Sequence, residues 1–177
     1  MTAQEIKGLA AAIHEAAVAK GFWNVENAKS KHVAKWRGEL GEVIQADRMG
    51  MMYEVERDGA KPEGVAAELA DFVMMVLDLF AAVYDGDAFD VICERKYTEK
   101  YTEAIETAQL YTLVNSLYTA TEDIVTCHSD EKLFAGMVFC VRAPEIWLKA
   151  RGYDLWELIR EKMAYNASRP KLHGRAY

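Results

Sequence analysis

The sequence predicts an all-α protein, a helical bundle of about seven helices in a single domain. Apolar residues recur with helical spacing from one end of the chain to the other, and alternation typical of strands is scarce. Only three prolines interrupt 177 residues, and several glycines stand where the periodic segments end. Hydrophobic residues make up 51% of the chain, which is enough for a sizeable core.

Caps and breakers set the expected helix boundaries. A capping box, Thr2-x-x-Glu5, opens the first helix, and Asp154-x-x-Glu157 opens the last. Pro62 is expected in the first turn of the third helix, and Pro144 is expected to kink or split the sixth. Turns are expected at residues 57–59, 85–87, 128–130 and 151–153. The helices are expected over residues 2–20, 29–48, 62–84, 87–96, 103–127, 131–150 and 154–168.

Composition excludes several classes of protein. A net charge of −7 argues against nucleic acid as the main partner. No apolar run reaches about 18 residues, so no membrane span is expected, and residues 1–12 carry no signal-peptide pattern. Cys93, Cys127 and Cys140 lack zinc spacing and are odd in number, which favours free thiols in a reducing, cytoplasmic location.

Two acidic pairs are the most informative motif. Glu39 and Glu42 share one helix face, and so do Glu68 and Asp71. The step from 39 to 68 equals the step from 42 to 71, 29 residues, and each pair lies on the same edge of an apolar stripe. The stripes are Trp36, Leu40, Val43 and Ile44 in one helix and Val65, Leu69, Phe72 and Val73 in the other.

Four carboxylates that face one another cannot all stay ionised without a cation. Hard oxygen ligands suit Mg²⁺, with Mn²⁺ as an alternative, and such a site handles phosphates. A single Glu-x-x-Glu pair is more often a solvated helix face. Gly38 and Gly41 directly precede Glu39 and Glu42. Each glycine destabilises the helix, which indicates that either a ligand or another helix approaches closely there.

A second group of polar residues lies near the C-terminus, in the pattern Lys162-x-x-x-Asn166-x-x-Arg169-Pro170-x-x-His173. Lys162 and Asn166 share a helix face, and lysine supplies a point charge for phosphate while asparagine donates or accepts. The alternative is a solvated basic tail in which His173 has no role.

Both motifs together resemble the all-α NTP pyrophosphatase superfamily, in particular its MazG-like members. Glu39-x-x-Glu42 is followed after 25 residues by Glu68-x-x-Asp71, and the ending from Lys162 to Gly174 is similar to that of MazG-like proteins, including many phage-encoded ones. Gly21-Phe22-Trp23 also fits. The resemblance covers about residues 20–85 and 150–175, and 94 residues separate Asp71 from Asn166, more than in a simple MazG-like unit.

The resemblance implies Mg²⁺-dependent hydrolysis of a nucleoside triphosphate, NTP or dNTP, to the monophosphate and pyrophosphate. Glu39, Glu42, Glu68 and Asp71 would be the metal ligands, with Glu39 or Glu42 as general base. The substrate-binding residues would be Lys162, Asn166, Arg169 and His173 for the phosphates and Trp23 or Trp36 for the base. Each tryptophan has an equally good interpretation as a core residue.

A weak internal repeat suggests two helical halves, about 20–102 and 103–174, and the alternative is chance similarity between amphipathic helix pairs. In the second half Ser116, Thr119, Lys132 and Ala135 replace the four acids. Duplication would make the chain a pseudo-dimeric monomer with one active site; a homodimer is the other expectation.

Two other functions were weighed. A carboxylate di-metal oxidoreductase needs Glu-x-x-His pairs, but the residues three before the histidines are Ala11, Lys29, Val125 and Pro170. A non-catalytic helical adaptor on the same fold needs neither the acids nor the tail.

Overall fold

The protein is all-α, as predicted. A computed structural model describes residues 1–23, 29–55, 61–84, 88–94, 98–126 and 129–169. The helices in these ranges are α1 (Ala3–Ala19), α2 (Lys29–Arg48), α3 (Val65–Val83), α4 (Ala88–Glu94), α5 (Glu99–Glu106), α6 (Leu110–Thr126), α7 (Asp130–Lys149) and α8 (Leu155–Ala167). None of them is long and apolar enough to span a bilayer.

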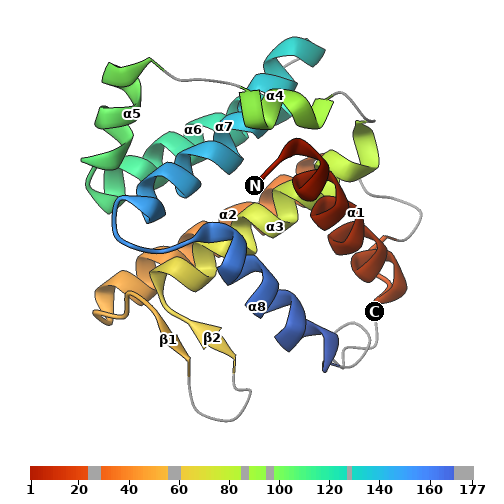
Figure 1. The fold of residues 1–177 in the computed structure, drawn as a ribbon, viewed down its shortest axis with the longest axis horizontal. Coiled ribbons are helices and arrows are strands. Elements are labelled where there is room, and N and C mark those ends of the chain that lie inside the picture. Colours follow the sequence, from red (N-terminus) through yellow and green to blue (C-terminus); the bar gives the residue numbers. More distant parts are fainter. Residues whose placement is uncertain (24–28, 56–60, 85–87, 95–97, 127–128, 170–177) are drawn as a thin grey trace.

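Two helix pairs form the centre of the fold. α2 packs along α3, α6 packs along α7, and the pairs meet through α2 against α6 and α3 against α7 (Figure 1). α1 and α8 both cover α3, while α4 and α5 lie on α7. The core between them contains the fully buried side chains of Trp36, Phe72, Phe80, Leu117 and Met137.

The arrangement also bears on the internal repeat. α1 precedes the predicted start of the first half and α5 spans the boundary between the halves, but their packing corresponds, α1 on α3 and α5 on α7. The last helix of each half contacts the other half, α8 on α3 and α4 on α7. This exchange is what a duplicated unit would show, and the duplication stays a prediction.

Most predicted boundaries agree with the structure because they depend on local chemistry. The Thr2–Glu5 capping box forms at the start of α1, and Asp154 accepts hydrogen bonds from two backbone N–H groups at the start of α8. Gly21, Gly50 and Gly152 have positive φ angles of 82°, 72° and 83° just after α1, α2 and α7. Only glycine adopts this conformation at little cost.

The start of the third helix was predicted wrongly. Pro62 belongs to a short strand, β2 (Pro62–Glu63), which pairs antiparallel with β1 (Glu54–Val55). Gly64 follows with φ 102°, and α3 begins at Val65. The N–H groups of Val65 and Ala66 donate to the carbonyls of Met51 and Met52, so the loop after α2 supplies the acceptors for the first turn of α3.

The long helix expected over residues 103–127 is two helices, α5 and α6, with a break at residues 107–109. The break has a tertiary cause. The carbonyl of Ala108 accepts hydrogen bonds from Trp147 Nε1 and Arg151 Nη2, both at 2.9 Å. Neither glycine nor proline marks this break in the sequence.

Pro144 does not split the sixth predicted helix, because α7 runs continuously from Asp130 to Lys149. The expected turns at 57–59 and 85–87, the expected start of the fourth helix at residue 87, and His128 of the expected turn at 128–130 lie outside the described residues. Cys127, Pro170 and His173 also lie outside them.

Candidate functional site

Three of the four predicted acids form one cluster. Glu39 and Glu42 project from α2 and Glu68 projects from α3, and one carboxylate oxygen from each lies within 4.8 Å of the others. Glu42 is exposed, Glu39 is half-buried and Glu68 is buried. Oxygens bound to one Mg²⁺ stand about 3 to 4 Å apart. Small rotations of the side chains are therefore enough to bring all three onto one cation.

The buried member of the cluster also has an oxygen without a hydrogen bond. Glu68 Oε2 accepts none in the described part of the chain, although Glu68 is only 5% exposed and the nearest cation, the Lys162 ammonium, stands 3.8 Å away. Buried carboxylate oxygens normally accept at least one hydrogen bond. The donor set, three carboxylates at the edge of solvent, fits a hard divalent cation such as Mg²⁺ or Mn²⁺.

The fourth acid, Asp71, contacts a lysine instead. Its Oδ2 lies 2.5 Å from the ammonium of Lys162, which also lies 3.8 Å from Glu68 Oε2 and donates to the carbonyl of Pro62 at 3.0 Å. Lys162 is 1% exposed. The sequence places this lysine near phosphate, whereas the structure places its ammonium among the acids. Lys61 approaches from the solvent side, with its ammonium 3.4 Å from Glu68 Oε1.

Crowding of the acids changes their protonation. Burial raises the pKa of Glu39 to about 8, and the negative charges of Asp71, Glu42 and Glu68 add to the effect. Burial also raises the pKa of Asp71 to about 6, although the Lys162 ammonium opposes the rise. At neutral pH without a cation, Glu39 is therefore mostly protonated, as expected for clustered carboxylates.

A cavity of about 860 Å³ opens beside the acids, between α1, α2, α3 and the end of α8. Glu39, Glu42 and Asp71 line one end of it. Four basic residues also line the cavity, namely Lys20, Lys31, Lys35 and Arg169. The volume is within the range of small-molecule sites, and the combination of acids and bases suits a phosphorylated ligand held partly through a cation.

The other end of the cavity contains a second polar group that the sequence analysis did not select. Asp78 Oδ1 lies 2.8 Å from His14 Nδ1, and Trp23 Nε1 donates to both Asp78 oxygens at 2.9 Å. The Trp23 ring lies 4.7 Å from the His32 ring and 4.8 Å from the His14 ring. Asp78 lies seven residues after Asp71 on the same face of α3, and this spacing was the available signal.

These contacts place the two tryptophans proposed for base stacking. Trp23 has its ring between two histidines and does not line the cavity. Trp36 is fully buried, packs edge-on against Phe72 and lines the cavity, and its Nε1 has no partner within the described ranges. Both therefore serve the core, and Trp36 also borders the ligand space.

The end of α8 reaches the same cavity. Asn166 and Arg169 line it. Lys20, at the end of α1, donates to the carbonyls of Asn166 and Arg169, the former at 2.9 Å. This lysine supplies a cation to the carbonyls at the C-terminal end of α8, where the helix dipole is negative. It thereby holds that end against the cavity.

Gly38 and Gly41 are exposed, and beyond the backbone of α2 itself and the residues adjacent to each glycine, no heavy atom of the described residues lies within 4 Å of the position that a Cβ would take. The interpretation that another helix packs on them is therefore wrong for the described residues. The alternative, that a ligand approaches, stays a prediction.

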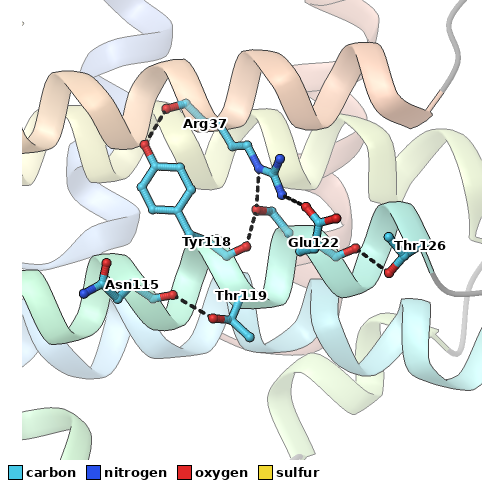
Figure 2. Close-up of polar contacts among 7 residues, drawn as sticks. Arg37, Asn115, Tyr118, Thr119, Glu122 and Thr126 are labelled. Atoms are coloured by element: carbon cyan, nitrogen blue, oxygen red, sulfur yellow. Dashed lines mark hydrogen bonds and ion pairs between the residues drawn. The ribbon is translucent and has the colours of Figure 1, made fainter.

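The second half contains no comparable cluster in the described residues. The hydroxyls of Ser116 and Thr119 donate to carbonyls one turn earlier in α6, and Lys132 is exposed. The neighbouring face of α6 is joined to α2 instead, as Figure 2 shows. Arg37 donates to Thr121 Oγ1 at 3.1 Å and pairs with Glu122, and Tyr118 donates to the Arg37 carbonyl.

Comparison with known proteins gave no match to a family model, a curated protein or a solved structure. The MazG-like resemblance therefore stays a prediction that rests on the motifs, and the site must be interpreted from its own geometry.

Proposed function

We propose that the protein is a Mg²⁺-dependent nucleoside triphosphate pyrophosphohydrolase, which converts an NTP or dNTP to the monophosphate and pyrophosphate. One observation carries the proposal: three glutamate oxygens within 4.8 Å of one another lie beside a cavity of about 860 Å³ with a basic lining. A triphosphate needs several positive charges. A cation bound to the glutamates and the lysines of the cavity together supply them, whereas the cation alone or the lysines alone do not.

Glu39, Glu42 and Glu68 hold the Mg²⁺, with Mn²⁺ as an alternative. When bound, the cation neutralises phosphate charge and lowers the pKa of a coordinated water. Glu39 or Glu42 is the general base, because both carboxylates belong to the cluster and line the cavity. The water oxygen attacks a phosphorus of the anhydride, its proton passes to the glutamate, and the bond to the departing phosphate oxygen breaks.

The basic residues stabilise the charge of the phosphates. Lys20 and Arg169 lie at the α8 end of the cavity, and Lys31 and Lys35 lie along α2. The nucleoside extends toward Asp78, which lies about 10 Å along α3 from Asp71 at 1.5 Å per residue. Trp36 borders this space.

In this proposal the triphosphate is the main partner, and the protein binds neither nucleic acid nor a membrane. Its location is the reducing cytoplasm.

Pyrophosphate release from each common NTP and dNTP, with Mg²⁺ and with a chelator, tests the proposal. Glu39→Gln and Glu68→Gln should each lower turnover at least about 100-fold, because each removes a metal ligand or the base. Glu15→Gln, an exposed glutamate on α1, is the matched control and should keep full activity. Absence of release with every substrate, or near-normal turnover in both site variants, would refute the proposal and favour the adaptor.

The histidines argue against the di-metal oxidoreductase. His14 and His32, the two in the described part of the chain, lie with Asp78 rather than at the glutamates. An all-carboxylate set suits Mg²⁺ better than the histidine-containing set of that class.

A further inference from the structure

We propose that Lys162 is a permanent internal cation of the acidic cluster: it engages Asp71 and limits the site to a single divalent cation, bound by Glu39, Glu42 and Glu68. The proposal deepens the proposed function and rests on its metal site. It assigns Lys162 a positioning role in place of the phosphate contact expected from the sequence.

The surroundings of the ammonium are those of a cation site. Three oxygens from two segments face it: Asp71 Oδ2 at 2.5 Å, the Pro62 carbonyl at 3.0 Å and Glu68 Oε2 at 3.8 Å. Asp71 and Glu68 belong to α3, and Pro62 belongs to β2, which is held by its pairing with Val55. These oxygens are therefore in place before any ligand binds.

The lysine is unable to turn toward a substrate. Its side chain is 2% exposed, and Lys162 does not line the cavity. Moving the ammonium out would leave Asp71 without its charge partner, and removing one partner of a buried ion pair is strongly destabilising. The lysine is therefore part of the framework of the site.

This position restricts where metal can bind. A cation that bridges Asp71 and Glu68 would occupy the space that the Lys162 ammonium fills, because that ammonium contacts both carboxylates. The remaining oxygens that come together are those of Glu39, Glu42 and Glu68.

Titration with Mn²⁺, followed by electron paramagnetic resonance, tests the stoichiometry. The wild-type chain should bind one Mn²⁺, and Lys162→Ala, which removes both the charge and the atoms that fill the space between Asp71 and Glu68, should bind two. Lys61→Ala is the matched control, because Lys61 contacts Glu68 from a more exposed position, and it should still bind one. Two ions on the wild-type chain, or one on Lys162→Ala, would overturn the proposal.

Asp71→Asn keeps the test decisive if Lys162→Ala does not fold. Asp71 is outside the coordination shell in this proposal, so Asp71→Asn should still bind one Mn²⁺ with an unchanged spectrum, whereas Glu39→Gln should lose the bound signal. A changed spectrum or a lost ion in Asp71→Asn would make Asp71 a ligand and overturn the proposal.

Thermal unfolding without metal tests the pair by itself. Asp71→Asn and Lys162→Met should each lower the midpoint, and the double variant should recover most of the loss, because no buried charge is left unpaired. Additive losses would overturn the pairing while leaving the proposed function intact. Failure of the wild-type chain to bind Mn²⁺ would overturn the metal site and the proposed function, while the unfolding experiment would still report on the pair.

Discussion

Glu39→Gln should stabilise the metal-free protein at neutral and alkaline pH. Burial and three neighbouring carboxylates raise the Glu39 pKa from 4.5 to about 8. A carboxyl with a raised pKa in the folded state destabilises that state once the unfolded chain ionises. The penalty is absent below pH 4.5, grows as pH rises toward 8 and is complete above that.

The size of the gain follows from these values. Each pH unit between 4.5 and 7 contributes about 1.4 kcal/mol, so the upper limit at pH 7 is about 3 kcal/mol. Glu39 is only half-buried, and side chains in a metal-free cluster relax, so we expect about 1–2 kcal/mol. In a chain of 177 residues this raises the unfolding midpoint by roughly 3 °C for each kcal/mol.

Thermal unfolding followed by circular dichroism, with a chelator present, measures the effect at pH 5 and pH 8. Glu39→Gln should raise the midpoint more at pH 8 than at pH 5, and Glu15→Gln, on the exposed face of α1, should change it little at either pH. Added Mg²⁺ should stabilise the wild-type protein, by about 2.7 kcal/mol at 100 times its Kd, but not Glu39→Gln. An equal gain at both pH values, or a loss at pH 8, would refute the electrostatic reasoning.

Three further predictions concern neighbouring parts of the structure. Mg²⁺ affinity should rise with pH up to about 8, because Glu39 must lose its proton before it binds the cation. Titration calorimetry at pH 6 and pH 8 measures the affinity, and equal affinities at the two pH values would contradict the prediction. Asp78→Asn should destabilise the fold by about 1.5–3 kcal/mol and change the tryptophan fluorescence, because Trp23 loses its charged hydrogen-bond acceptor. Urea unfolding measures the loss, and an unchanged midpoint would count against this prediction. Gly64→Ala should destabilise the protein by about 1–3 kcal/mol, since Gly64 has φ 102° and a Cβ would lie 2.9 Å from a backbone carbonyl. Gly41→Ala, with open space around it, should instead stabilise α2 by about 0.5–1 kcal/mol. Thermal unfolding of the two variants should show midpoint shifts of opposite sign.

Much of the fold was predictable because helix boundaries depend on neighbouring residues. The Thr2 and Asp154 caps and the positive-φ glycines at 21, 50 and 152 act within one turn of the helices that they end or begin. The acidic cluster was predictable for the same reason. Glu39 and Glu42 share a face through helical spacing alone, and the matching stripes of α2 and α3 bring Glu68 beside them.

The wrong predictions have tertiary causes. The break between α5 and α6 is held by Trp147 and Arg151, about 40 residues further along the chain. The late start of α3 depends on Met51 and Met52, whose carbonyls cap its first turn, and on the pairing of β1 with β2. Neither feature has a local sequence signal, because the hydrogen-bond partners come from other elements.

The role of Lys162 shows the same division most clearly. The spacing of Lys162 and Asn166 predicts that both lie on one face of a helix, but it does not predict which residues pack against that face. Because α8 packs on α3, Asp71 contacts this face, and Lys162 is buried against a carboxylate 91 positions earlier in the chain. Which charges pair inside a protein depends on which helices meet, and tertiary packing decides that.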